Sequence, residues 1–402
     1  MCLIHLFILK FHNLKAISHN TIRIMSEILT GGSQTVTKRL GSDWEAMHGF
    51  LGSSEWEAPE LTKRCDEEAR PGYDTKLAHE YNDISEVLSM KIALLARLIR
   101  KSRNCIAYTG AGLSRSAGIS DYATKGTADS GWKKVSAWAA KPTVSHRVLV
   151  ELYRQRMLKR WIQQNHDGLP QKAGLPQEAI NEIHGAWYDP SNPVVKMDGK
   201  LRDDLFADLL EWEQKTDLTL ALGTSLCGMN ADRVFSTVAK KAKSGDSSSL
   251  GGVVVSLQET AVDSLCALRI FARLDDVMGL LANELGLEIP EETQYKPMIT
   301  AGITDISDVF EIPYDKEGKL LSGDTITKMT LDLRVDARIK VTSGPHRSTR
   351  GKVIRKTVGG HYDLELIHVG MSTSTTVYKL GSWWVQAAVN GTMNEIPIVN
   401  VR

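Results

Sequence analysis

The sequence of 402 residues lacks the features that mark several large classes of protein. Its five cysteines, Cys2, Cys65, Cys105, Cys227 and Cys266, lie far apart and form no C-x-x-C pair, which favours a reducing compartment over a disulfide framework. No apolar run approaches the roughly 18 residues that a transmembrane helix needs. The 49 basic and 48 acidic residues nearly cancel, so any charged partner must be bound locally. We therefore expect an intracellular protein that is not an integral membrane protein.

The first 24 residues have no acidic residue, although they contain Lys10, Lys15 and Arg23, and they precede Met25. An acid-poor, amphipathic leader is typical of a mitochondrial presequence. An upstream start codon or a disordered tail explains the same composition, and both interpretations stay open. The following stretch, up to residue 75, shows no sustained periodicity. We therefore assign residues 1–75 to an N-terminal extension.

Strands and helices alternate through the centre of the sequence. The stretch "DISEVLSMKIALLARLIRKS" has helical spacing and ends in cations, and apolar strands such as "CIAYTG", "DLTLALGTS" and "GVVVSLQ" follow it. Such alternation predicts an α/β fold with a Rossmann-like, doubly wound parallel sheet over residues 76–290. Ligands of these sheets bind beyond the carboxyl ends of the strands, where Thr109, Asn165, His184, Thr224 and Ser256 all fall.

The composition changes after "LGLEIPEETQYKPM", and residues 291–324 are predicted to be a linker. Residues 325–402 have the pattern of short strands and resemble the small KOW or Tudor-like β-barrels, with Trp383 and Trp384 on alternate faces of a strand. Eleven Lys and Arg stand there against five Asp and Glu. The basic turn near Arg347 and Arg350 either contacts nucleic acid or protein, or is a solvated loop.

The stretch "IAYTGAGLSRSAGISDY" contains closely spaced glycines but not the G-x-G-x-x-G fingerprint of ordinary dehydrogenases, because the glycine after Gly112 is Gly118. Gly110 and Gly112 would let backbone N–H groups approach an anion, and Ser114 would offer a hydroxyl near a helix start. The loop is therefore either a phosphate site or a structural turn.

Polar side chains follow two further strands. "QQNHDGLPQKAG" places Gln164, Asn165 and Asp167 after an apolar strand, where amides and an acid can hold ribose hydroxyls and a carboxamide. "INEIHG" places His184 after another strand, where an imidazole can act as a general base near neutral pH. Either group is also compatible with a structural role.

In this order, "TGAGLSRSAGISDY", "QNHDGL", "HG" and "LGTSL" resemble the motifs of the sirtuins, the NAD-dependent protein deacylases. The resemblance covers about residues 76–290. Further stretches, among them "GKLRDDLFADLLEWE", "VVVSLQET" and "LGLEIP", are most similar to the nuclear, chromatin-associated sirtuins.

The resemblance implies a reaction in which NAD loses nicotinamide and the carbonyl oxygen of an acyl-lysine attacks the ribose carbon left behind. The products are the free lysine, nicotinamide and O-acyl-ADP-ribose. It implies a catalytic group of three residues, in which His184 is the base and Asn165 and Asp167 hold the nicotinamide ribose and carboxamide. It also implies a set of NAD-binding residues: Gly110, Ala111, Gly112, Ser114, Gly118, Asp121, Tyr122, Gln164, Gly223, Thr224, Ser225, Ser256, Gln258 and Leu274.

The sequence departs from the sirtuin pattern in two places. It has neither Cys nor His between His184 and Cys227, where most sirtuins hold a structural zinc, so we expect no metal site and a reduced small domain. Ala123 stands where the family usually has an arginine. The alternatives are therefore an NAD hydrolase or ADP-ribosyltransferase, and a catalytically inactive module that binds NAD or ADP-ribose.

The resemblance also implies a partner and a compartment. The expected partner is an acylated protein, with histones and chromatin proteins as candidates, and no membrane. The expected location is the nucleus or the cytoplasm, or the mitochondrion if residues 1–24 are a presequence.

Overall fold

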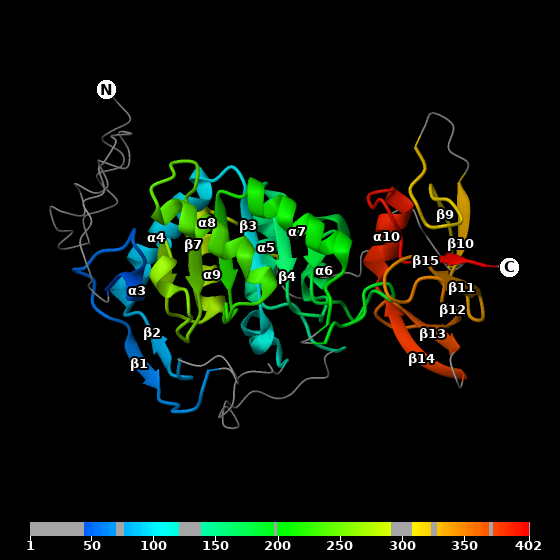
Figure 1. Ribbon diagram of the computed structural model, residues 1–402, viewed down its shortest axis with the longest axis horizontal. Helices are drawn as coiled ribbons and strands as arrows, with labels where there is room; N and C mark the ends of the chain where they lie inside the picture. The colour runs from blue at the N-terminus through cyan, green and yellow to red at the C-terminus, as the bar shows by residue number, and fades with distance from the viewer. Residues whose placement is uncertain are drawn as a thin grey trace. The chain divides into compact units, whose positions relative to one another are not determined.

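The computed structural model describes residues 44–69, 76–119, 138–196, 199–290, 308–322, 328–369 and 373–401. A six-stranded parallel sheet has the strand order β5-β4-β3-β6-β7-β8, and Figure 1 labels β3, β4 and β7 of it. Its strands are β3 (Cys105–Thr109), β4 (Arg160–Gln163), β5 (Ile180–Glu182), β6 (Leu218–Leu222), β7 (Gly251–Val255) and β8 (Leu268–Ile270). Every residue of β3, β6 and β7 is buried, as continuous apolar strands of a parallel sheet require.

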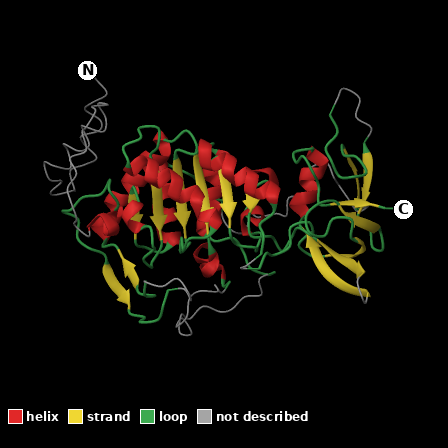
Figure 2. Cartoon of the chain, in the orientation of Figure 1, coloured by secondary structure: helices red, strands yellow, loops and turns green. Residues whose placement is uncertain are grey.

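Helices cover both faces of this sheet (Figure 2). Cys105 and Ala107 of β3 pack in one hydrophobic cluster with α4 (Ser85–Lys101), α5 (Val144–Arg154) and α9 (Leu274–Leu285). The alternate residues, Ile106 and Tyr108, pack in another cluster with α7 (Asp203–Lys215) and α8 (Arg233–Lys243). Because successive side chains of a strand point to opposite faces, those of β3 contribute to two separate hydrophobic clusters. The predicted parallel α/β sheet is confirmed.

A buried ion pair fastens α4 to the chain around it. Lys91 Nζ donates to Asp83 Oδ1 at 2.6 Å, and both side chains are fully buried. Lys91 also donates to the carbonyl of Met47, which lies in the five-residue helix α3 (Trp44–His48), and Asp83 Oδ2 accepts from the N–H of Phe271 at the end of β8. The pair thus ties three separate segments together.

Short elements complete this part of the chain. They are the antiparallel pair β1 (Glu60–Lys63) and β2 (Glu80–Asn82), the one-turn helix α6 (Leu169–Lys172), and the 3₁₀ turns η1 (Ala111–Ala117), η2 (Gln177–Ala179), η3 (Asn230–Asp232) and η4 (Asp263–Leu265). No helix of the described ranges combines the length and the apolar character needed to cross a membrane.

The carboxyl-terminal part forms a five-stranded antiparallel sheet in the order β14-β13-β12-β11-β15. The strands are β11 (Arg338–Val341), β12 (Arg350–Lys356), β13 (Tyr362–Val369), β14 (Thr373–Leu380) and β15 (Ile398–Asn400). A separate pair, β9 (Val309–Ile312) and β10 (Met329–Asp332), packs in the same hydrophobic cluster. β9 lies inside the range predicted to be a linker, and the domain boundaries and the closure of the sheet into a barrel stay predictions.

The expectation that Trp383 and Trp384 lie in a strand is wrong, because both lie in the helix α10 (Ser382–Asn390). The helix ends at Gly391 with a φ of 64°, the left-handed conformation that glycine adopts without strain. Both indoles are buried, so side chains of the helix make the packing contacts that we assigned to a strand. The stretch "VQAAV" between them and Gly391 contains good helix formers, a signal that outweighed the aromatic pair.

Candidate functional site

The loops that follow β3, β4, β5, β6 and β7 all leave the same edge of the sheet, because these strands are parallel. The chain order reverses on either side of β3, since β4 and β5 lie beyond one side of it and β6 to β8 beyond the other. Such a switch point opens a crevice in which doubly wound sheets bind their ligands. The predicted site residues that the structure describes lie on these loops, except Leu274, which follows β8.

Gly110 and Gly112 allow the loop after β3 to pack against the loop after β6. A Cβ atom on Gly110 would lie 2.8 Å from the carbonyl oxygen of Gly223, and one on Gly112 would lie 2.8 Å from the Cα of Gly223. The N–H of Gly112 donates to that same carbonyl at 2.9 Å. These two glycines therefore have a packing role that the sequence did not reveal. Gly118, with a φ of 82°, terminates η1.

Three of the predicted residues form one hydrogen-bonded group. Ser114 Oγ donates to Asp167 Oδ2 at 2.6 Å, and Asn165 Nδ2 donates to Ser114 Oγ at 3.0 Å and to the carbonyl of Gly110 at 2.9 Å. Asp167 Oδ1 accepts from the N–H of Leu169 at the start of α6. Ser114 and Asp167 are buried. The carboxylate, the hydroxyl and the amide are therefore held in fixed orientations before any ligand binds.

Gln164 links the two sides of the switch point, because its Nε2 donates to Thr224 Oγ1 at 2.8 Å. Thr224 is buried, whereas Ser225 is exposed. This hydrogen bond joins the loop after β4 to the loop after β6.

His184 lies two residues after the end of β5 and is half-buried. Its own backbone carbonyl accepts from the N–H of Val195 at 3.0 Å. The next residue, Gly185, has a φ of 96°, and its carbonyl is 2.8 Å from Nδ1 of His166. The N–H of Trp187 donates to the carbonyl of His166 at 2.9 Å. The segment that carries His184 and the segment that carries Asn165 and Asp167 are therefore hydrogen-bonded to each other.

A buried acid lies two residues before His184. The pKa of the Glu182 carboxyl is raised to about 8, mainly by burial and also by the nearby Asp189 and Asp167, against the hydrogen bonds from Gln171 and Gln177 that lower it. Near neutral pH this group is thus a protonated acid. Sequence reasoning missed this acid, because an acid at the end of a strand is ordinarily solvated.

The raised pKa of Glu182 predicts a pH dependence of stability. The protonated form stabilises the fold fully below the ordinary pKa of 4.5, and this stabilisation is lost as the pH rises to about 8. Glu182→Gln keeps the shape without the ionisation. We expect the melting temperature of the variant, relative to wild type, to increase between pH ~5 and ~8 and to level off at higher pH. Thermal unfolding across that range measures it, with the exposed Glu211→Gln as control. Parallel profiles for wild type and Glu182→Gln would contradict the assignment.

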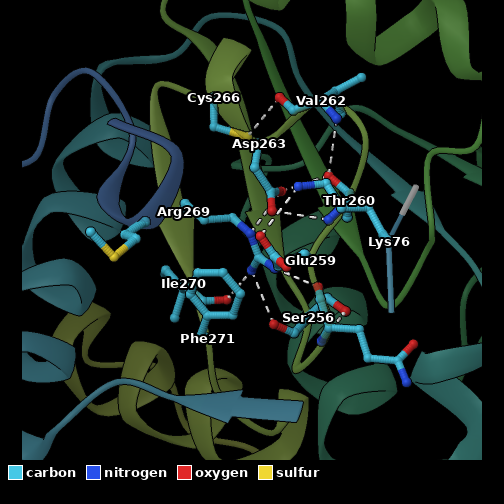
Figure 3. A network of polar contacts seen from close by, with 12 residues as sticks. Lys76, Ser256, Glu259, Thr260, Val262, Asp263, Cys266, Arg269, Ile270 and Phe271 are labelled. Atoms are coloured by element: carbon cyan, nitrogen blue, oxygen red, sulfur yellow. Dashed lines mark hydrogen bonds and ion pairs between the residues drawn. The ribbon is translucent and has the colours of Figure 1, made fainter. Parts of the chain in front are cut away.

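The loop after β7 is held by a buried arginine that sequence reasoning missed. Arg269 Nε donates to Asp263 Oδ1 at 2.9 Å, and one terminal nitrogen donates to the carbonyl of Ser256 at 3.0 Å (Figure 3). The other terminal nitrogen donates to the carbonyl of Gln258 at 2.6 Å. The guanidinium also lies 3.6 Å from the centre of the Phe271 ring. The two residues expected beside adenosine are thus fixed through their backbones. A cation inside the apolar strand "LRIF" was the available signal.

Leu274, the remaining expected residue of the adenosine side, opens α9. Its neighbour Asp275 accepts from the hydroxyl of Ser116 at 2.6 Å and from both the N–H and the hydroxyl of Ser145. The acid therefore joins the glycine loop, α5 and α9. Ala111 lies half-buried at the start of η1. Asp121, Tyr122 and the family departure at Ala123 lie outside the described residues.

Within the described ranges, no three His, Cys, Asp or Glu side chains are grouped as a metal site would require. That the protein carries no zinc stays a prediction.

The architecture is that of a doubly wound α/β protein with polar loops gathered at the switch point of its sheet. A profile of the Sir2 family matches residues 128–196, the stretch that contains Asn165, Asp167 and His184. The NAD-dependent protein deacetylase Sirt6 of Drosophila melanogaster is 30% identical over 291 residues, which cover 60% of this chain and 91% of the fly protein. The chain therefore belongs to the Sir2 family, and the predicted resemblance to sirtuins is confirmed.

Mammalian relatives agree with this assignment. The NAD-dependent protein deacetylases sirtuin-7 of Bos taurus and of Mus musculus are each 30% identical, over 268 and 264 residues respectively. Each match covers 55% of this chain and 66% of the relative, just under two thirds of its length.

Proposed function

We propose that this protein is an NAD-dependent protein deacylase that removes acetyl or related acyl groups from lysine side chains. In this reaction the bond between nicotinamide and ribose breaks, and the acyl oxygen forms a new bond to the ribose carbon. Water then releases the lysine, so that nicotinamide, free lysine and O-acyl-ADP-ribose are the products. Family membership supports the proposal, as does the name shared by the fly and mammalian relatives.

The observation that carries the proposal is the hydrogen-bonded group of Ser114, Asn165 and Asp167 on one loop system, with His184 on the adjoining segment. We assign Asn165 and Asp167 to the nicotinamide ribose and carboxamide, and the glycine loop with Gly223 and Thr224 to the diphosphate. Ser256, Gln258 and Leu274 are assigned to the adenosine. An amide and a carboxylate already held by Ser114 suit a small polar ligand, because little ordering remains to be done on binding.

The chemistry needs few catalytic groups. Nicotinamide leaves as a neutral molecule, so no strong acid is required beside the bond that breaks. A pocket that excludes water favours the charge redistribution, and a base must then accept the proton of the attacking ribose hydroxyl. His184 is the residue to which we assign that role.

The finer assignments follow from the same proposal. We infer acylated proteins as substrates, with histones and other chromatin proteins as candidates and the nucleus as the compartment. We also infer that no zinc is needed, since the segment between His184 and Cys227 has no Cys or His. Purified protein analysed for bound metal, with its activity measured after exposure to a zinc chelator, tests that last point.

The experiment that tests the proposal supplies the full chain with NAD and a set of lysine peptides that carry acetyl and longer acyl groups. We expect deacylated peptide to accumulate only when NAD is present, with a preference among the acyl groups. Mass spectrometry of the peptides measures it, and reactions without NAD are the control. Loss of NAD without any deacylated peptide would instead indicate a hydrolase or an ADP-ribosyltransferase. Bound NAD with no reaction would indicate a nucleotide-binding module.

We propose in addition that the outward face of β11 and β12 binds a nucleic acid. Arg338 lies directly opposite Lys352, and Lys340 directly opposite Arg350, in the register of the two strands. Like charges directly opposite each other destabilise a sheet, and a polyanion would relieve that repulsion. Lys340 and Lys352 are half-buried and have acidic partners, whereas Arg338 and Arg350 are exposed and have no ion pair within the described ranges.

The double change Arg338→Glu and Arg350→Glu should weaken binding of RNA or duplex DNA at least ~10-fold and reduce the slope of log affinity against log salt by about 2, one for each lost phosphate contact. Fluorescence anisotropy at several salt concentrations measures both quantities. The matched control reverses two exposed cations elsewhere, Lys101 and Lys240. No measurable binding by wild type would contradict the proposal and leave a protein partner for this face.

A further inference from the structure

A tryptophan of the carboxyl-terminal part contacts both segments that carry the proposed catalytic residues. Trp383, at the second position of α10, is 3% exposed. Its ring centre lies 5.0 Å from that of Tyr188, four residues after His184. A Cβ atom on Gly168, the residue after Asp167, would lie 3.0 Å from Trp383 Cη2 and 3.0 Å from Tyr188 Cδ2. The indole therefore lies against the two segments where they meet.

Tyr188 belongs to the hydrophobic cluster of the carboxyl-terminal sheet, not to either cluster that covers the parallel sheet. The N–H of Gly381 donates to its carbonyl at 3.0 Å, and the ring of His361 lies 4.8 Å from its ring. A Cβ atom on Gly381 would lie 2.3 Å from the Trp383 indole, which folds back over it. The loop after His184 is thus built into the core of the other sheet.

Two further contacts hold the same region. A Cβ atom on Gly344, with a φ of 68°, would lie 1.8 Å from the carbonyl oxygen of Ser191, so the turn after β11 packs directly on the loop after His184. The hydroxyl of Thr392 donates to Glu178 Oε2 at 3.0 Å, just before β5. The carboxyl-terminal part therefore contacts the chain before and after His184.

Titratable groups lie where the carboxyl-terminal part packs on the loop after His184. Their protonation states are compatible with a contact that stays the same near neutral pH. The N–H of Ser382 donates to Nδ1 of His361 at 3.2 Å, which requires that nitrogen to be unprotonated. The pKa of His361 is lowered to about 4, mainly by burial and also by Lys172 and Lys379, against Asp363, which raises it. Lys172 lies 5.2 Å from the Tyr188 ring centre, and burial lowers its pKa to about 8. His361 therefore stays neutral, and keeps its contact, at neutral pH.

We propose that the carboxyl-terminal part is a positioning element of the catalytic site, in which Trp383 fixes the His184 segment relative to the Asp167 segment. This inference rests on the proposed function. The hydrophobic clusters of the parallel sheet do not alone cover the loops that carry the proposed catalytic residues, because Tyr188 packs in the cluster of the carboxyl-terminal sheet. Because small displacements of catalytic groups cost large factors in rate, the contact is expected to act on turnover more than on NAD affinity.

The test compares two neighbouring tryptophans of α10. Trp383→Ala removes the contact with Gly168 and Tyr188, whereas Trp384→Ala removes a buried indole of the same cluster that has no ring contact with Tyr188 among the described residues. We expect both variants to melt at lower temperature. Only Trp383→Ala should lower kcat, by at least ~10-fold, with the Kd for NAD changed less than ~3-fold, and Trp383→Phe should recover part of the loss.

Amide hydrogen exchange of the full chain without ligands supplies a readout that does not depend on activity. Peptides spanning residues 185–192 should exchange at least ~10-fold faster in Trp383→Ala than in Trp384→Ala, because protection reports local opening. Equal exchange in that segment, or equal kcat in the two variants, would overturn the inference. If Trp383→Ala does not fold, the same comparison is made with Trp383→Phe and Trp384→Phe. A wild type without turnover would contradict the proposed function, while exchange would still decide the positioning contact.

Discussion

Replacing His184 by alanine is expected to lower acyl-peptide-dependent turnover by about 10²–10⁴-fold, the usual contribution of a positioned general base. His184 follows β5 in a loop whose backbone is fixed by Val195 and by the glycine at 185, so removing the imidazole should leave the loop in place. The Kd for NAD should change less than ~3-fold, since the residues assigned to NAD lie mainly on other loops. Steady-state kinetics and calorimetric titration with NAD measure the two quantities.

A matched histidine variant makes this prediction specific. His368 lies half-buried on β13, in the carboxyl-terminal sheet, and His368→Ala should keep turnover within ~2-fold of wild type. Turnover of His184→Ala above a tenth of the wild-type value would contradict the role of base. A drop in NAD affinity as large as the drop in turnover would indicate a binding role instead.

The second large effect concerns stability. Lys91→Met should reduce the free energy of unfolding by about 3–5 kcal/mol, because it leaves Asp83 buried without its cation. The double variant Asp83→Asn with Lys91→Met removes both charges and should be less destabilised than Lys91→Met alone. In the wild type, the carboxylate of Asp83 accepts a hydrogen bond from the N–H of Phe271, and the amide oxygen introduced by Asp83→Asn can still accept it.

Chemical denaturation measures these free energies, and Lys101→Met at the exposed end of the same helix is the control. We expect the control to lie within ~0.5 kcal/mol of wild type, as exposed positions usually do. Lys91→Met within about 1 kcal/mol of that control would show that the ion pair contributes little to the fold. A double variant less stable than the single one would show that Asp83 is needed for its other hydrogen bond.

The parallel sheet was predictable because its strands are continuous apolar runs bounded by polar loops. Cys105–Thr109 and Leu218–Leu222 are fully buried, as such runs predict, and the polar residues after each strand come together because parallel strands end at one edge. The helix α4 begins and ends close to the periodic stretch that predicted it. Local pattern and global fold agree in these elements, which is the condition under which sequence reasoning works.

The rest depends on contacts between residues distant in sequence. No local pattern shows that Gly110 faces Gly223, that Arg269 reaches the carbonyls after β7, or that Glu182 is buried beside other acids. α10 was misassigned because an aromatic pair favours a strand, whereas tertiary packing and the helix formers after it decide otherwise. The packing of Trp383 on Tyr188 was likewise invisible, since the two residues lie 195 positions apart in the sequence.

The measurement that tests the central claim most directly is nicotinamide release from NAD by the full chain, with and without acyl-lysine peptides. The account predicts release only when an acylated peptide is present, with one O-acyl-ADP-ribose formed for each nicotinamide. Release at the same rate without peptide, or free ADP-ribose as the sole nucleotide product, would contradict it.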